Sequence, residues 1–65
     1  MSDMIKIAVD AMGGDNAPKK IIDGIIFHHK SNKKSFYKIF GDEKKIKSVI
    51  QSKIDKEFYE IVHTE

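Results

Sequence analysis

Short apolar runs along the chain alternate with segments in which apolar residues recur every three or four positions. The runs cover residues 4–9, 36–40 and 58–62, and they are rich in β-branched or aromatic side chains, as is typical of strands. The first run is almost continuously apolar. We therefore expect both faces of that strand to be covered, as in a parallel sheet.

The first segment between these runs has helical periodicity. Pro18 stands where the helix would begin, with Asn16 or Ala17 as the boundary residue, and proline suits a first helical turn. Gly24 weakens a helix by about 1 kcal/mol relative to alanine, which favours close packing as the reason for it. Phe27 falls outside the apolar stripe and needs another layer to cover it. The stripe itself, with a polar tip, consists of Ile21, Ile22, Ile25, Ile26 and His29.

A second helix is predicted after the second strand. Asp42 is a good amino-terminal cap, and Glu43 places negative charge in the positive first turn. Residues 55–57 then turn the chain into the third strand. The apolar stripe of this helix consists of Ile46, Val49, Ile50 and Ile54.

The resulting order is β-α-β-α-β. Helical crossovers between strands imply parallel pairing with right-handed connections, which is the opening of an α/β three-layer domain. Three parallel strands leave two open sheet edges. We therefore expect residues 1–65 to be the amino-terminal part of a single larger domain, in truncated form.

Composition narrows the classes of function. All twelve basic residues are lysine, the net charge is +2 and cysteine is absent. Disulfides and thiolate metal sites are thereby excluded, and the lack of arginine argues against nucleic-acid binding. The first apolar run is too short for a secretory signal or a membrane span, so a cytoplasmic protein is expected.

Glycine and polar residues gather where the predicted strands end. These ends share one edge of a parallel sheet, and ligands bind at that edge in open α/β sheets. A glycine pair lets a ligand approach the main chain, and the helix start that follows offers N–H groups to phosphate. His63 at the same edge is a secondary candidate, as an acid–base group. The candidate substrate-binding residues are Asp10, Gly13, Gly14, Asp15 and Asn16.

A structural interpretation of the same loop stays open. Asp10 and Asp15 would repel an anion, and two carboxylates fall short of a full set of metal ligands, so no metal site is predicted. Asp10 can instead bond the backbone of its own loop, while Asp15 or Asn16 caps the helix. His28 and His29 near the helix end interact favourably with its dipole, and the residues around them do not have the spacing of a zinc site.

The segment Asp10-Ala11-Met12-Gly13-Gly14-Asp15, preceded by a strand and followed by Ala17-Pro18, resembles the start of the bacterial phosphate acyltransferases of the PlsX type. The resemblance continues through residues 22–24, 40–43 and 61–65. It spans nearly all of this chain but only about the first fifth of a family member. It therefore identifies residues 1–65 as the amino-terminal part of a phosphate acyltransferase domain.

The resemblance implies an enzyme of phospholipid synthesis, which converts acyl groups on acyl carrier protein, together with inorganic phosphate, into acyl phosphate. It implies the fold of phosphate acetyltransferases and of isocitrate and isopropylmalate dehydrogenases. Neither a redox cofactor nor an obligate metal is implied, and the separate catalytic roles are unassigned. For the full-length protein it implies a homodimer that associates peripherally with the membrane.

Two other interpretations remain. Because its active site would be incomplete, the 65-residue chain is expected to be inactive alone. It would then be either a non-catalytic remnant or an interaction module that pairs through its open sheet edges. A small phosphate- or nucleotide-binding domain rests on the glycine loop alone. That loop matches neither the dinucleotide fingerprint nor the P-loop.

Overall fold

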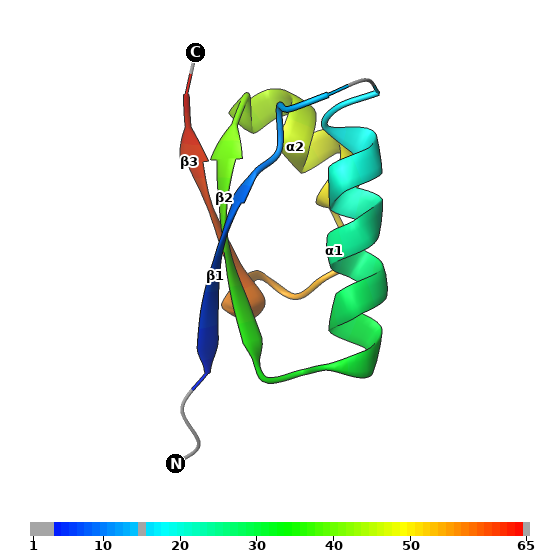
Figure 1. The fold of residues 1–65 in the computed structure, drawn as a ribbon, viewed down its shortest axis with the longest axis vertical. Helices are drawn as coiled ribbons and strands as arrows, with labels where there is room; N and C mark the ends of the chain where they lie inside the picture. Colours follow the sequence, from blue (N-terminus) through cyan, green and yellow to red (C-terminus); the bar gives the residue numbers. More distant parts are fainter. Residues whose placement is uncertain (1–3, 15, 65) are drawn as a thin grey trace.

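The computed structural model describes residues 4–14 and 16–64, and its elements follow the predicted order (Figure 1). One sheet holds three strands in the order β1-β2-β3, and both strand pairs are parallel. The predicted β-α-β-α-β start of an α/β domain is thereby confirmed. The elements are β1 (Ile5–Asp10), α1 (Lys19–Ser31), β2 (Ser35–Gly41), α2 (Glu43–Ile50), the 3₁₀ turn η1 (Lys56–Phe58) and β3 (Tyr59–His63).

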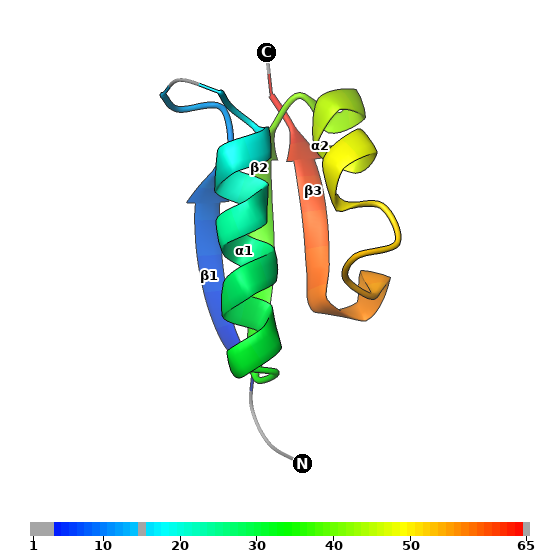
Figure 2. The same ribbon diagram turned by 90° about the vertical axis from the view of Figure 1, so that its right-hand side faces the viewer.

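Both helices lie on one face of the sheet, α1 over β1 and β2 and α2 beside β3 (Figures 1 and 2). The chain therefore supplies two of the three expected layers. On the other face, no helix lies within residues 4–14 and 16–64. The expectation that both faces of β1 are covered is not met in this part of the chain, where Ile5 is 61% exposed and Ala8 is also exposed.

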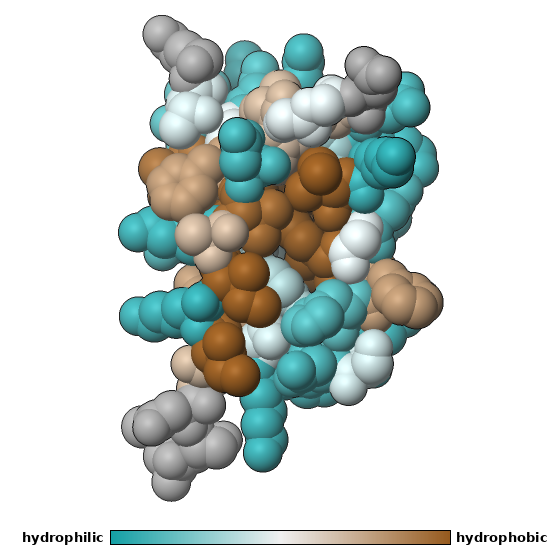
Figure 3. Space-filling model, in the orientation of Figure 1, coloured by the Kyte–Doolittle hydropathy of each residue, from teal (hydrophilic) through white to brown (hydrophobic). Residues whose placement is uncertain are grey.

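The core lies between the sheet and the two helices. Burying an isoleucine side chain is worth about 1.5–3 kcal/mol, so this isoleucine-rich layer is the main source of stability. Figure 3 shows apolar residues reaching the surface between the sheet and α1, beside the edge strand β1. The buried apolar residues are Ala11, Ile22, Ile25, Tyr37, Ile39, Ile46, Ile50 and Ile54.

Two local expectations need correction, and Phe27 stays without an explanation in the described part of the chain. Ile54 is buried, but it lies in the turn after α2, because the helix ends at Ile50 and Ser52 has a positive φ of 66°. A Cβ added at Gly24 would meet no atom of the described residues within 4 Å apart from its own helix backbone, so close packing does not explain that glycine. Phe27 is 75% exposed and no element of the described chain covers it.

His29, the polar tip of the first stripe, is buried at the end of α1. Its ring packs on Phe58 with the centroids 4.7 Å apart, and Nδ1 has no hydrogen-bond partner among the described residues. Burial lowers the pKa of His29, and the charge of Lys33 lowers it further, while Asp55 acts in the opposite direction. His29 is therefore a neutral core residue near neutral pH.

Acidification is expected to destabilise the fold through His29. Because folding lowers its pKa below 6.5, the unfolded chain binds more protons, and the free energy of unfolding falls as the pH falls below that value. His29→Leu should remove this contribution, since leucine fills the site without a titratable group. Urea denaturation near pH 7 and near pH 5 (roughly the window set by the reference histidine pKa) measures the change. An equal loss of stability in both proteins would contradict the assignment.

Candidate functional site

The carboxyl ends of the three strands meet at the upper edge of the sheet in Figure 1, where both helices also begin. Backbone hydrogen bonds tie the strand ends together: Ala11 N–H donates to the carbonyl of Phe40 at 2.9 Å, and Thr64 N–H donates to that of Gly41 at 2.9 Å. The predicted common edge is therefore present. The loop after β1 lies on one side of Gly41, and His63 lies on the other.

Asp10 is held by its own loop. Its Oδ1 accepts the backbone N–H of Met12 at 3.0 Å, which is the local bond that the structural interpretation predicted. Its Oδ2 would lie 3.9 Å from a Cβ placed on Gly13. One carboxylate oxygen thus shapes the turn, and the other lies near Gly13.

The glycine pair leaves space at the edge. Gly14 has a φ of 86°, a conformation that favours glycine, and a Cβ there would meet no atom of the described chain within 4 Å. Asn16 also has a positive φ, of 63°, which asparagine tolerates better than most residues. The loop therefore combines a backbone shape specific to these residue types with open space beside Gly14.

The start of α1 differs from the expected capping. Pro18 occupies the cap position, without a side-chain capping bond, and the Asn16 carbonyl accepts the N–H of Lys20 at 3.1 Å. Asn16 thus contributes its backbone carbonyl here. Asp15, the remaining candidate of the loop, lies outside the described residues.

A shallow hollow of about 450 Å³ lies beside the loop, between Asn16 and Asp23. Lys19 spans part of it, with its Nζ 2.8 Å from Oδ2 of Asp23, and this hydrogen bond lowers the pKa of the Asp23 carboxyl. Lys20 also lines the hollow. A second hollow, of about 500 Å³, lies between the end of α2 and η1, far from the strand ends, and does not belong to this site.

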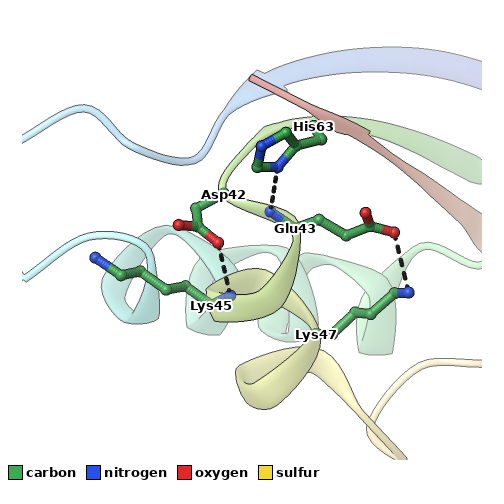
Figure 4. Close-up of polar contacts among 5 residues, drawn as sticks. All are labelled: Asp42, Glu43, Lys45, Lys47 and His63. Atoms are coloured by element: carbon green, nitrogen blue, oxygen red, sulfur yellow. Dashed lines mark hydrogen bonds and ion pairs between the residues drawn. The ribbon is translucent and has the colours of Figure 1, made fainter. Parts of the chain in front are cut away.

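His63 meets the start of α2 on the other side of the edge (Figure 4). The N–H of Glu43 donates to Nδ1 of His63 at 3.1 Å, although the two residues are far apart in the sequence. Asp42 is the predicted cap, and its Oδ1 accepts the N–H of Lys45 at 3.2 Å. Glu43 also pairs with Lys47 at 3.0 Å, and the hydrogen bond from Lys47 lowers its pKa.

Sequence reasoning placed His63 at the edge but missed its bond to Glu43. The parallel register pairs Gly41 with His63, which brings the imidazole beside the first residues of α2. The predicted strand ends are the signal that could have revealed this pairing, because the second and third predicted strands each end one residue before it, at Phe40 and Val62. The candidate residues Asp10, Gly13, Gly14 and Asn16 share one loop, and His63 approaches the edge from β3.

Residues 4–14 and 16–64 contain no cluster of three or more His, Asp or Glu side chains that would hold a metal ion. Within the same residues, no helix has the length and apolar character that crossing a membrane requires.

Comparison with known proteins gives the family. The chain is 61% identical to a phosphate acyltransferase of Pelagibacter ubique over 64 residues, which are 98% of this chain and 19% of that protein. It is 45% identical to the phosphate acyltransferase of Lacticaseibacillus casei over 60 residues, or 92% of this chain and 17% of that protein. The Streptococcus uberis enzyme of the same name is 45% identical over 62 residues, 95% of this chain and 18% of that protein.

The chain thus spans somewhat less than a fifth of the length of these relatives. The family model described as fatty acid synthesis protein matches residues 5–65, from the first residue of β1 to the last residue of the chain. Every candidate residue at the edge lies within that match. The chain belongs to the fatty acid synthesis protein family.

Proposed function

We propose that the protein is a phosphate acyltransferase, which moves an acyl group from acyl carrier protein to inorganic phosphate and feeds phospholipid synthesis. The observation that carries this proposal is the 61% identity to the phosphate acyltransferase of Pelagibacter ubique over nearly the whole chain. A phosphate oxygen attacks the thioester carbonyl, the C–S bond breaks, and the carrier thiol leaves with a proton. The products are acyl phosphate and free carrier protein.

The loop after β1 is proposed as part of the substrate site. Its candidate residues are Asp10, Gly13, Gly14, Asp15 and Asn16. The position of Gly14 supports this, because a Cβ placed on it would meet no atom of the described chain within 4 Å, which leaves room for a ligand beside the main chain. Oδ2 of Asp10 lies near Gly13, and Lys20 supplies positive charge at the neighbouring hollow.

The chain is proposed to be one part of a larger active site. A site of this class uses several strand ends, and the relatives are about five times longer than this chain. The 65-residue chain is therefore proposed to be inactive alone. A cytoplasmic, peripherally membrane-associated homodimer that uses no cofactor is the corresponding proposal for the whole protein.

The test is phosphate-dependent formation of acyl phosphate from acyl carrier protein bearing an acyl chain, measured with the longest form of the protein. Free carrier protein and acyl phosphate are expected in equal amounts, and neither is expected when phosphate is omitted. Release of carrier protein at the same rate without phosphate would identify a thioesterase and contradict the proposal.

A second function, as a non-catalytic interaction module, is favoured by the uncovered sheet face. Phe36, Phe40 and Val62 are only partly buried there, and Lys38 lies over the Phe40 ring at 5.9 Å. Size-exclusion chromatography, run beside the acyl phosphate assay, distinguishes the interaction module from the enzyme. A stable complex with another α/β chain, without acyl phosphate formation, favours the module.

A further inference from the structure

We propose that His63 binds the reacting carbonyl: its neutral imidazole donates the Nε2–H to the thioester oxygen as that oxygen becomes an oxyanion. The inference rests on the proposed function and adds to it a residue with a defined role.

The hydrogen bond from Glu43 determines the tautomer of His63. A backbone N–H can only donate, so Nδ1, at 3.1 Å from it, must accept and therefore carries no proton. The neutral ring then carries its proton on Nε2. In Figure 4 the bonded nitrogen faces the start of α2 and the other ring nitrogen is turned away from the helix. The exposed side chain thus presents a single donor to the edge.

The backbone holds the ring in this position. His63 is the last residue of β3 and pairs in register with Gly41, while the next residue, Thr64, donates to the Gly41 carbonyl at 2.9 Å. The strand is therefore anchored on both sides of the Cα that carries the imidazole. Such preorganisation lets a donor act on a developing charge without the cost of reorientation.

The start of α2 strengthens this donor. Glu43 is the first residue of the helix, so its N–H belongs to the positive end of the helix dipole. A hydrogen bond into Nδ1 polarises the ring and makes Nε2–H a better donor, because hydrogen bonds in a chain reinforce one another. A neutral imidazole held against a helix start acts as an electrophile toward carbonyl groups in other enzymes.

The helix start itself is largely satisfied within the chain. The N–H of Glu43 is bonded to His63, and that of Lys45 is bonded to Asp42. The imidazole therefore extends the donor character of this helix end to the edge. A single neutral donor suits an oxygen that gains charge only during the reaction, whereas a phosphate dianion is better matched by lysine ammonium groups.

Two substitutions separate the functions of the two ring nitrogens. His63→Asn places an amide oxygen near the Nδ1 position, where it still accepts from Glu43, but it removes the outer donor. His63→Gln places an amide N–H near the Nε2 position and gives up the inner contact. Steady-state kinetics with acyl carrier protein substrate and phosphate are measured for the longest form of the protein. His28→Asn, near the carboxyl end of α1 and away from the carboxyl ends of the strands, is the control. Nδ1 of His28 lies 2.6 Å from the Tyr37 hydroxyl, so the stability of this variant is measured alongside its kinetics.

We expect His63→Asn to lower kcat about 100-fold with an unchanged KM for phosphate, since loss of one oxyanion donor costs at least this much. The kcat of His63→Gln should stay within about tenfold of that of the unaltered protein. The kcat of His28→Asn should equal that of the unaltered protein. Full activity of His63→Asn overturns the inference, as does a raised KM for phosphate with an unchanged kcat. A greater loss in His63→Gln than in His63→Asn assigns His63 a structural role and also overturns it.

Two further observations distinguish a failure of this inference from a failure of the proposed function. If the unaltered protein forms no acyl phosphate, the proposed function fails and the inference fails with it, whereas an active protein with an active His63→Asn variant overturns the inference alone. Nitrogen-15 NMR of labelled histidine reports the tautomer without any substitution. A proton on Nδ1 of His63 overturns the inference even if a variant does not fold.

Discussion

Replacing Gly41 with alanine is expected to lower the free energy of unfolding by about 2–4 kcal/mol, because overpacking and backbone strain act together. Gly41 has a φ of 157°, which residues with a Cβ rarely adopt. The new Cβ would lie 2.6 Å from Cγ of Met12 and 3.0 Å from Cδ1 of Ile46. Ile46 is fully buried, so it has little room to move. Urea denaturation followed by circular dichroism measures the change.

A double-mutant cycle separates the two causes. Met12→Ala removes the closest contact, so Gly41→Ala should cost about 1–2 kcal/mol less in that background, and the remaining cost reports the backbone and Ile46. Gly24→Ala is the control, because a Cβ at this helical position would meet no atom of another element in the described chain within 4 Å. That control should gain up to about 1 kcal/mol. If the cost of Gly41→Ala is the same with and without the Met12 side chain, the contact with Met12 is not its cause.

Gly41 shows what a local pattern can predict and what it cannot. A glycine after an apolar run predicts the end of a strand, and β2 does end at Gly41. The crowding at this glycine comes from Met12, which reaches it only because β1 and β2 pair in parallel. Sequence periodicity is a property of neighbouring residues, so it carries no information on that contact.

The helices illustrate the same limit. The stripe of α1 was predictable because the burial of Ile22 and Ile25 follows the helical period directly. The stripe of α2 continued to Ile54 in the sequence, but the helix ends earlier, since the turn at Ser52 brings Ile54 back to the core. Apolar periodicity predicts which residues are buried more reliably than it predicts the element that carries them.

The position of the candidate edge could be predicted from the sequence, but the contacts between its residues could not. Strand ends in a parallel sheet meet at one edge whatever their sequence, which placed Asp10, Gly41 and His63 together. The sequence left open whether Asp10 bonds its own loop, and the structure shows that bond, from the Met12 N–H to Oδ1 of Asp10. The bond from Glu43 to His63 depended on the register of β2 and β3, which periodicity does not determine.

Replacing Gly14 with asparagine is expected to reduce acyl phosphate formation about 10- to 100-fold and to change the free energy of unfolding by less than about 1 kcal/mol. Asparagine tolerates the positive φ of 86° better than most residues, and its Cβ would meet no atom of the described chain within 4 Å. The fold therefore has no strong reason to change. The side chain instead fills the space through which a ligand would approach the main chain.

Kinetics and urea denaturation of the same preparation distinguish the explanations of that result. Gly24→Ala is the matched control, since it also adds a Cβ at an open glycine but lies within α1, and its activity should equal that of the unaltered protein. Gly14→Ala adds less volume, so its loss of activity should be smaller than that of Gly14→Asn. Full activity in Gly14→Asn would remove Gly14 from the substrate site. If activity instead falls in step with stability across the three variants, backbone strain explains the effect. Loss of a ligand contact would lower activity without lowering stability.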